Sequence, residues 1–541
     1  MLSKVDKSKL REDIFRHLDG LVMAPVAYTL FEKGVTDALL ESQKVSPADL
    51  AIRFGSNEGY LNVALRLLTA QGWIDRKVEE NDIFYLPNDK SVTAFSYFRH
   101  YGDVVRLLKF GEDFHPRKFE VEPFLVLKDI MTKYKNQYYF NEAANEIEQD
   151  IQQQVLKHIE GAIVGPTVVH LGMGGMFHKY FMEASFRAEE FHKDPESFSI
   201  ILDFLCWLGW FHCKNRTYSF TDKGLFFARR ASAYGVTVSY LPMLRHVDEL
   251  IFGDPHFLRD VSPGEPEKHV DREMNVWGSG GAHSTYFKKV DEIIIDIFNR
   301  DLNEQPRGIL DMGCGNGAFL KHIFEVIELR TKRGQHLEDY PLFLVGADYN
   351  EAAIKVTRSN LIQADIWAKV IHGDIGRPDL LAQTLQEDYG ISLSDLLNVR
   401  TFLDHNRIWS DPDPELVRGR KAIGSGAFAH RGLRLDNKAV EANLLQHLEK
   451  WSPYVQKHGL LIIELHTVAP ELVAAAPGQT PVTAYDATHG FSDQYIVELE
   501  VFLKIAEEAG LVSQPKYFSK YPNNELAAVS IHLLKEKEKA K

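Results

Sequence analysis

Asp311 and three closely spaced glycines form the stretch of this sequence best suited to hold a cofactor. Gly313, Gly315 and Gly317 follow Asp311 at alternate positions in RGILDMGCGNGAFL. Glycines let the backbone turn sharply and approach a ligand closely, and a helix after such a turn presents free N–H groups and a positive dipole. The apolar residues before Asp311 predict a strand, and those after Gly317 predict a helix. Strand, glycine turn and helix form the first unit of a doubly wound α/β domain.

Two further acids are placed where they could contact the same cofactor. The strand predicted in LFLVGADYN ends at Asp348, beside Tyr349, and an acid there can accept both hydroxyls of a ribose. The strand predicted in AKVIHGDI ends at Asp374, beside Ile375, within reach of an adenine edge. Ligands of open α/β sheets lie across the C-terminal ends of the strands, so all three acids are expected along one edge.

The order acid-x-Gly-x-Gly-x-Gly resembles the first motif of class I S-adenosylmethionine (SAM) methyltransferases, and three motifs in register rarely mislead. A dinucleotide-binding fold would place no acid at Asp311. The resemblance implies a seven-stranded doubly wound sheet over residues 304–541. The residues that would hold SAM are Asp311, Gly313, Gly315, Gly317, Asp348, Tyr349, Asp374, Ile375 and Arg400. A nicotinamide-binding domain and a sheet that binds no ligand are the alternatives.

Histidines and other polar residues follow the later strands of the same sheet. The run DHNR, which contains His405, follows the fourth predicted strand; His466 ends the fifth, and His489 and Gln494 lie in the next loop. A histidine there could take a proton from a hydroxyl as a general base. Imidazole with a carboxylate or amide oxygen could instead hold Fe, Mn or Zn as a Lewis acid. Side chains that merely hydrogen-bond in a cleft are the plain alternative.

A glycine cluster precedes the predicted core. The stretch WGSGGAHSTYF predicts a flexible loop over Gly278–His283 beside the cofactor, followed by an amphipathic helix. His283 and Tyr286 are candidates to line this loop between donor and substrate, because loop residues on a rigid scaffold often carry function. A plain linker with a glycine hinge is the alternative.

The rest of the chain is predicted to be mostly helical. Residues 1–110 contain helix, turn, helix and two strands, a winged-helix pattern, and residues 111–235 hold a helical segment and a second, weaker copy. Residues 236–303 comprise the linker, glycine-rich loop and leading helix. Residues 304–541 form the catalytic core, with a polar insertion near 409–437 that is predicted to be a mobile lid. The helix in SNEGYLNVALRLLTAQ lacks the cationic cluster that DNA requires, which favours a dimerisation or covering role.

Composition excludes several classes of function. The 541 residues suffice for two or three domains. The formal net charge of −14 argues against nucleic acid as a partner. The cysteines Cys206, Cys213 and Cys314 are scattered without metal-type spacing, which favours a reducing compartment. No signal core and no apolar run near the ~20 residues of a membrane helix is present, so a cytoplasmic enzyme is expected.

Four stretches together resemble a narrower family. WGSGGAHSTYFKKVDEII, LDMGCGNGAFL, FLDHNR and YDATHGFSDQYIVE are similar to the mononuclear iron- or manganese-dependent methyltransferases of polyketide starter-unit loading modules, such as those of the apratoxin, gephyronic acid and saxitoxin pathways. In that family, SAM methylates the α-carbon of a malonyl unit on an acyl carrier protein, and the metal chelates the malonyl group. The resemblance implies SAM and iron or manganese as cofactors and a carrier-bound malonyl-type substrate as partner.

The same resemblance assigns the metal ligands by motif to His405 and Gln494, and strand-end position alone adds His466 as a third candidate. Two other functions stay open. One is a metal-free O-methyltransferase for a small natural product, with His405 or His466 as base. The other is a winged-helix regulator that senses SAM, which the acidic charge opposes. A homodimer is compatible with each of these functions, since winged-helix modules can pair.

Overall fold

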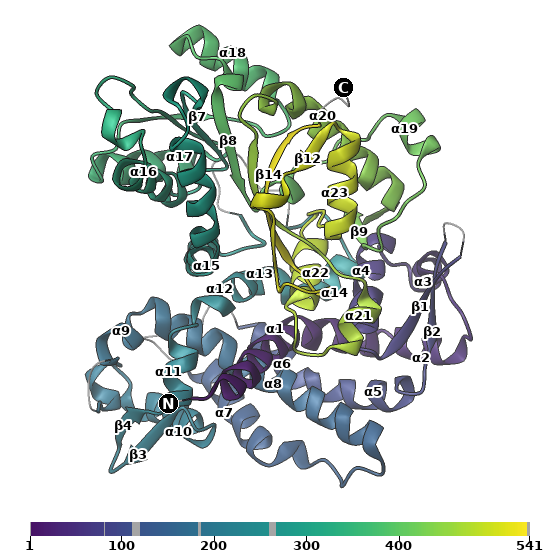
Figure 1. Ribbon diagram of the computed structural model, residues 1–541. Coiled ribbons are helices and arrows are strands. Elements are labelled where there is room, and N and C mark those ends of the chain that lie inside the picture. Colours follow the sequence, from purple (N-terminus) through teal and green to yellow (C-terminus); the bar gives the residue numbers. More distant parts are fainter. Residues whose placement is uncertain (1, 80–81, 111–119, 182–184, 259–266, 538–541) are drawn as a thin grey trace. The chain divides into compact units, whose positions relative to one another are not determined.

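The structure is a computed structural model that describes residues 2–79, 82–110, 120–181, 185–258 and 267–537 (Figure 1). The chain forms two compact units. Unit 1 consists of Met1–His283, Ala427–Arg434 and Ala469–Asp493. Unit 2 consists of Ser284–Gly426, Leu435–Val468 and Gln494–Lys541. Unit 1 therefore also takes in two segments that the sequence analysis placed in the catalytic core. Among the described residues, no helix is long and apolar enough to cross a membrane.

Unit 2 is built on one eight-stranded sheet, whose strand order is β12-β14-β11-β8-β5-β6-β7, with β13 paired to β14. The strands are β5 (Gly308–Met312), β6 (Phe343–Asp348), β7 (Ala368–His372), β8 (Leu396–Thr401), β11 (Leu460–Leu465), β12 (Leu511–Ser513), β13 (Ser519–Tyr521) and β14 (Val529–Glu536). Neighbouring strands from β7 to β11 are parallel, and β14 is antiparallel to β11. This confirms the predicted doubly wound sheet, but the short β12 adds an eighth strand to the predicted seven.

The strand order reverses between β5 and β8, because the chain first builds from β5 through β6 to β7 and then returns to the other side of β5. Ligands of such sheets bind where the order reverses. The helices of unit 2 are α16 (Ala318–Arg330), α17 (Glu351–Gln363), α18 (Pro378–Tyr389), α19 (Pro414–Gly419), α20 (Asn437–Val455) and α23 (Leu499–Glu508). The central strands β5, β8 and β11 are mostly apolar and almost entirely buried, as expected for strands covered on both faces.

Helix α15 (Arg272–Phe298) replaces the predicted glycine loop. The loop prediction for Gly278–His283 was wrong, because these residues continue the helix. Gly278 is needed for packing instead of for flexibility: a Cβ there would lie 2.6 Å from the backbone nitrogen of Val236, in α12 (Ser232–Ser239). A glycine costs about 1 kcal/mol in a helix, and the close helix contact offsets that cost. The side chain of His283 lies outside the described part of the helix.

Unit 1 is mostly helical. Its other helices are α1 (Lys4–Glu32), α2 (Val35–Glu41), α3 (Pro47–Phe54), α4 (Glu58–Ala70), α5 (Ser91–Tyr97), α6 (Gly102–Leu108), α7 (Val121–Lys135), α8 (Glu146–Met173), α9 (Met176–Tyr180), α10 (Pro195–Trp207), α11 (Asp222–Ala228), α13 (Leu241–Leu244), α14 (Val247–Phe252), α21 (Pro470–Ala475) and α22 (Val482–Gly490). Helices α1 and α8 cross at Gly20 and Gly161. A Cβ on Gly161 would lie 2.3 Å from the carbonyl oxygen of His17, so only glycine allows this crossing.

Two antiparallel hairpins follow helices in unit 1, as the sequence predicts. The first is β1 (Ile74–Glu79) with β2 (Asp82–Pro87), after α3 and α4. The second is β3 (Phe211–Lys214) with β4 (Thr217–Phe220), after α10. A third hairpin, β9 (Phe428–His430) with β10 (Leu433–Leu435), lies in the predicted lid.

Part of the predicted lid is anchored in unit 1. The backbone N–H of Gly59 donates to the carbonyl of Gly432 over 2.9 Å, and Arg434 pairs with Glu58 at 3.0 Å. A Cβ on Gly59 would lie 2.6 Å from the Leu433 carbonyl oxygen. These contacts hold the second half of the insertion, so a mobile lid stays a prediction for residues 409–426 alone.

Candidate functional site

The glycine turn has the backbone that its composition predicts. Gly313, Gly315 and Gly317 have φ angles of 77°, 57° and 78°, a left-handed region that favours glycine. The turn joins the end of β5 to the start of α16, for which Gly317 is the N-terminal cap. A Cβ on Gly315 would meet no atom within 4 Å, whereas one on Gly317 would lie 2.9 Å from Thr357. The space at Gly315 is thus open, and Gly317 packs against α17.

Asp311 is buried at the C-terminal end of β5, with 1% of its surface exposed. Neither carboxylate oxygen has a hydrogen-bond partner among the described residues. Burial, reinforced by the nearby Asp348 carboxylate, raises the pKa of Asp311 to about 7. A buried carboxylate without a partner is costly. The site therefore favours a cationic group beside Asp311.

Asp348 ends β6 and braces the glycine turn. Its Oδ2 accepts the backbone N–H of Gly315 at 3.0 Å, and its Oδ1 accepts that of Asn350 at 2.9 Å. A carboxylate offers about four lone-pair positions, so two remain for ribose hydroxyls. Tyr349 beside it is 60% exposed, and its ring lies 5.4 Å from that of His372.

Asp374 follows β7 on the same edge of the sheet, and its Oδ1 accepts the backbone N–H of Gly376 at 2.7 Å. Ile375 is buried, and its carbonyl accepts the indole N–H of Trp451 at 2.7 Å. The structure thus brings the three predicted acids to the ends of three adjacent strands, β5, β6 and β7.

Arg400 was predicted to contact the cofactor, but its side chain lies in a buried polar group. Its side chain has no exposed surface. Its Nη1 pairs with Asp404 at 2.5 Å, and the guanidinium lies 4.0 Å from the ring of Trp451. His447, on α20, completes this buried group through a 2.9 Å contact between Nε2 and Asp404. Since the guanidinium has no surface to offer a ligand, Arg400 is a structural partner of Asp404, and its prediction as a cofactor residue was wrong.

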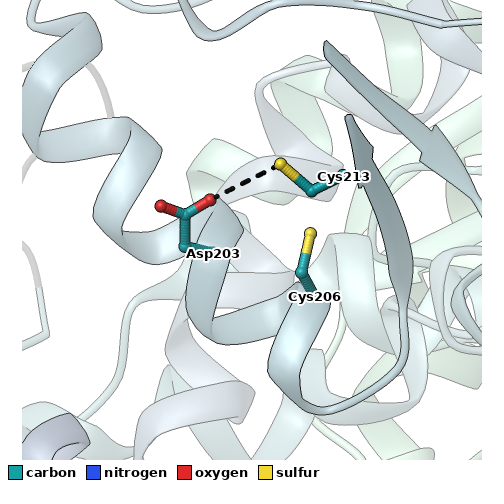
Figure 2. A group of neighbouring side chains, drawn as sticks. All are labelled: Asp203, Cys206 and Cys213. Atoms are coloured by element: carbon teal, nitrogen blue, oxygen red, sulfur yellow. Dashed lines mark hydrogen bonds between the residues drawn. The ribbon is translucent and has the colours of Figure 1, made fainter. Parts of the chain in front are cut away.

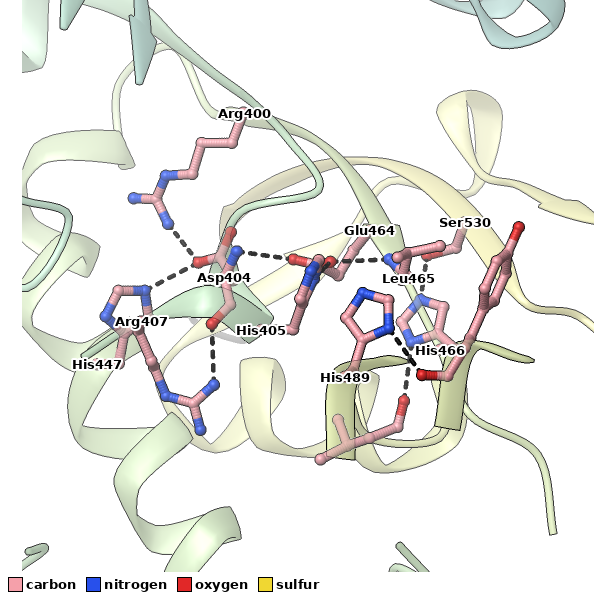
Figure 3. A network of polar contacts seen from close by, with 12 residues as sticks. Arg400, Asp404, His405, Arg407, His447, Glu464, Leu465, His466, His489 and Ser530 are labelled. Atoms are coloured by element: carbon pink, nitrogen blue, oxygen red, sulfur yellow. Dashed lines mark hydrogen bonds and ion pairs between the residues drawn. The ribbon is translucent and has the colours of Figure 1, made fainter. Parts of the chain in front are cut away.

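His405 is held by a carboxylate that the sequence analysis did not identify (Figure 3). It lies in the short 3-10 helix η7 (Asp404–Asn406) after β8, with 5% of its surface exposed. Its Nδ1 is hydrogen-bonded to Glu464, at the end of the neighbouring strand β11. Glu464 also accepts the backbone N–H groups of Asp404 at 2.9 Å and Leu465 at 2.8 Å. A carboxylate that binds one ring nitrogen fixes the tautomer and directs the other nitrogen toward a ligand.

The segment that carries Gln494 lies beside His405 in unit 2. The backbone N–H of Tyr495 donates to the carbonyl of His405 over 2.8 Å. Gln494 is 8% exposed. The structure therefore brings the backbones of both predicted metal ligands together, although 89 positions separate them in the sequence.

His466 does not have the surroundings of a catalytic base. It is fully buried after β11; its Nε2 contacts the Ser530 hydroxyl at 2.6 Å and its Nδ1 the Val497 carbonyl at 3.2 Å. Burial lowers its pKa to about 3. Both ring nitrogens are engaged within the fold, so His466 is neither a base nor a third metal ligand. The geometric argument from its strand-end position was wrong because the side chain turns toward β14.

Tyr286, on α15, is packed among aromatic rings. Its ring lies 6.1 Å from that of Phe402 and 5.2 Å from that of Tyr521. Burial raises the pKa of its hydroxyl to about 12, so the group stays protonated as a hydrogen-bond donor. His489 belongs to unit 1, on α22, where Nδ1 contacts the Tyr485 carbonyl at 2.7 Å.

The missed residues left weak signals in the sequence. Glu464 is a single acid inside the apolar strand LLIIEL, and a buried acid needs a partner. His447 lies on an apolar face of α20, where a histidine is more often structural than functional. Neither signal identifies the residue that the side chain contacts, because the contacts with His405 and Asp404 form only when the chain folds.

Three family profiles match the chain. They describe an AprA N-terminal domain over residues 10–76, an AprA winged helix domain over 160–254 and an AprA MT2-like domain over 267–532. No curated protein matches. The second hairpin module of unit 1 lies in the winged helix match, and the glycine turn, His405 and Gln494 lie in the MT2-like match.

Several solved structures overlap weakly with this chain. The apo SAM-dependent methyltransferase SibL is 13% identical, with a TM-score of 0.38 over 69% of this chain and 96% of that one. An O-methyltransferase family 2 protein from Planctomyces limnophilus, complexed with apigenin, is 11% identical, with a TM-score of 0.37 over 99% and 98%. The CurJ carbon methyltransferase is 12% identical, with a TM-score of 0.31 over 76% and 99%. The fold assignment rests on the strand order of unit 2 and on the family profiles.

Proposed function

The chain belongs to the AprA-type SAM-dependent methyltransferases, and we propose that it methylates the α-carbon of a malonyl-type acyl thioester with the aid of bound iron or manganese. The observation that carries this proposal is the His405–Glu464 pair at the ends of β8 and β11. Strand β8 lies next to β5, which leads into the glycine turn. A ligand histidine and the predicted methyl donor would therefore occupy one edge of one sheet.

Residues at the ends of β5, β6 and β7 suit SAM. SAM carries a sulfonium and an ammonium group, and both are cations. Asp311 supplies a buried carboxylate whose oxygens lack partners among the described residues. Asp348 holds the turn at Gly315 and keeps acceptor capacity for hydroxyls. The glycine turn and the start of α16 complete the support for the donor.

His405 and Gln494 suit an iron or manganese ion. The Glu464 carboxylate accepts the Nδ1 hydrogen of His405, so a metal would bind at Nε2. The amide oxygen of Gln494 is a hard ligand compatible with manganese or ferrous iron. An ion held there would act as a Lewis acid and stabilise the enolate of a chelating 1,3-dicarbonyl group. The protein then needs no strong base, in agreement with the buried, neutral His466.

The carrier protein is the proposed partner, because a malonyl unit is presented as a thioester in the pathways that the AprA name suggests. Tyr286, whose hydroxyl stays protonated, is proposed to donate a hydrogen bond on the acceptor side. A metal-free O-methyltransferase would need a histidine base, and among the two histidines considered for it only His405 keeps that option.

Metal analysis with matched variants tests the proposal. The purified chain is assayed for iron and manganese, and for methyl transfer from SAM to a malonyl thioester on a carrier protein. His405→Ala and Gln494→Ala should each lose the metal and the activity. His336→Ala, in the turn after α16, and Gln383→Ala, on the surface of α18, are controls that should keep both.

The position of the transferred methyl group decides between the functions. Isotope-labelled methyl on the α-carbon, lost with the metal, supports the proposal. A metal-free protein that methylates hydroxyl acceptors would overturn it and leave His405 as a base. Methylation that survives both chelation and His405→Ala would overturn both assignments.

A further inference from the structure

Three side chains that could bind a metal converge in unit 1, whereas the residues proposed for methyl transfer belong to unit 2 (Figure 2). Asp203 and Cys206 lie on α10, and Cys213 lies on β3. One ligand atom of each lies within 4.8 Å of the other two. The Cys213 Sγ is 3.9 Å from Oδ1 of Asp203. Among the described residues, no other trio of His, Cys, Asp or Glu is this close.

Local structure explains why these residues meet. Asp203 and Cys206 are three positions apart, so both project from one face of α10. The chain then reverses into the hairpin of β3 and β4, in which Cys213 pairs with Tyr218. Alternation along β3 directs Cys213 to one side and its neighbour His212 to the other. A spacing of seven residues between the cysteines is no recognised metal motif, which is why the sequence did not reveal the group.

Tyr218 orients the carboxylate of this group. Its hydroxyl donates to Oδ1 of Asp203 over 2.9 Å, and its side chain is 1% exposed. Ligands of metal sites are commonly held by such hydrogen bonds from buried neighbours. Asp203 and Cys213 themselves are exposed and Cys206 is half-buried, so a cation has access from solvent.

We propose that Asp203, Cys206 and Cys213 form a site for a zinc-type divalent cation that ties the β3–β4 hairpin to α10. Two thiolates and a carboxylate are a ligand set that favours zinc. With Zn–S bonds of ~2.3 Å, the ligand atoms of a tetrahedral site lie about 3.8 Å apart. The three ligand atoms, which lie within 4.8 Å of one another, reach a separation of about 3.8 Å through small side-chain rotations. Water fills the fourth position.

Binding is balanced by proton release. The cation takes the place of one proton on Cys206 and one on Cys213, and both protons leave to solvent. The charge of the dication offsets that of the two new thiolates. Affinity therefore falls as the pH is lowered, because protons compete for the sulfur atoms.

Cobalt titration of the full chain under reducing conditions tests the site. Co²⁺ on thiolates gives sulfur-to-metal charge-transfer absorption, which a histidine–glutamine site cannot produce. In the His405→Ala variant, which should lack the proposed iron or manganese site, we expect this absorption to saturate at one equivalent of Co²⁺ and to be lost on displacement by Zn²⁺. Cys206→Ser, Cys213→Ser and Asp203→Asn should each weaken binding by more than 10-fold, and Tyr218→Phe by about 10-fold. His212→Ala, on the opposite side of β3, is the control and should bind as the wild type does.

Three outcomes would overturn the site. One is the absence of thiolate charge transfer in the wild-type protein. Another is unchanged affinity in Asp203→Asn, an exposed substitution that should not prevent folding. The third is a thiol titration that finds Cys206 and Cys213 joined as a disulfide despite the reductant. Retention of the absorption in the His405→Ala variant would support the assignment, because it separates this site from the proposed iron or manganese site.

Discussion

The imidazole of His405 is hydrogen-bonded to the carboxylate of Glu464 across 59 positions of sequence. The carboxylate does not depend on the histidine for its position, since it also accepts the backbone N–H groups of Asp404 and Leu465. The Glu464 carboxylate therefore fixes the orientation of the His405 ring, and the ring is not what positions the carboxylate. This one-way support suits a ligand histidine, because the ring nitrogen that would bind a metal must point in one direction before the metal arrives.

Glu464→Gln should weaken metal binding by about 10–100-fold, because an amide no longer fixes the histidine tautomer. SAM affinity should stay the same, since Glu464 lies on β11 and the donor residues lie on β5, β6 and β7. Competition with a chelator measures the first quantity and calorimetry the second. Glu507→Gln, on the exposed side of α23, is the control. Equal metal affinity in wild type and Glu464→Gln would remove Glu464 from the site.

Asp311→Asn should reduce SAM affinity by about 2 kcal/mol at pH 8, the value of a hydrogen bond to a charged group. Burial and Asp348 raise the pKa of Asp311 to about 7 in the protein without ligand. Wild-type affinity for the cationic donor should therefore rise between pH 6 and 8 as the carboxyl ionises, and the variant should show no such rise. Calorimetric titrations at several pH values measure both. If the SAM affinities of the wild type and the variant depend on pH in the same way, Asp311 does not bind the donor.

The raised pKa of Asp311 also makes the stability of the folded protein depend on pH. The folded-state pKa of about 7 lies above the value of 3.8 for an unperturbed aspartate, so the folded protein holds this proton more tightly than the unfolded chain does. Stability from this group is present below the unfolded pKa and is lost as the pH rises through 7. Without SAM, Asp311→Asn should therefore raise the melting temperature at pH 8 more than at pH 5. Thermal scans at the two values check the sign.

Local patterns in the sequence were enough to predict the sheet and its acids. Asp311 and Asp348 lie at the ends of apolar runs of strand length, and Asp374 follows the mixed run AKVIH. Strands covered by helices on both faces are mostly apolar. Each of these signals lies within about ten residues of chain. The partner of a buried polar residue is not local. Glu464 and His447 are 59 and 43 positions from the residues they contact, and nothing near them in sequence names those partners.

The helix at Gly278 also depends on a contact between residues that are distant in the sequence. A run of glycines indicates flexibility when judged alone. Here the absence of a Cβ is required by the backbone at Val236, 42 positions earlier, against which Gly278 packs. His466 failed for a related reason: the end of β11 is a correct place for a catalytic residue, but the side chain is hydrogen-bonded to Ser530 on β14.

Acid should unfold unit 2 through the buried Arg400–Asp404–His447 group. Burial lowers the pKa of His447 to about 4, and Arg400 and His447 hold the pKa of Asp404 below its usual range. Both shifts are downward, so the stability is complete above pH 6.5 and is lost as the pH falls through 4. His447→Gln removes one such proton, and the pH slope of the unfolding free energy should fall by about 1.4 kcal/mol per pH unit in this window. Denaturant titrations at several pH values measure that slope, and an unchanged slope would show that His447 is not buried as a neutral ring.

Gly161→Ala should destabilise unit 1 although alanine favours helices. The added Cβ would lie 2.3 Å from the carbonyl oxygen of His17, where α8 crosses α1. Alanine gains about 1 kcal/mol from helix propensity, but separating two packed helices costs about 1–3 kcal/mol or more. Gly280→Ala is the matched control, since a Cβ there meets no atom within 4 Å and α15 is helical at that point. Thermal melting should thus move in opposite directions for the two variants. A gain in both would mean that α1 and α8 do not approach at Gly161, and the buried pair of His17 and Glu160, 3.2 Å apart at this crossing, could not form either.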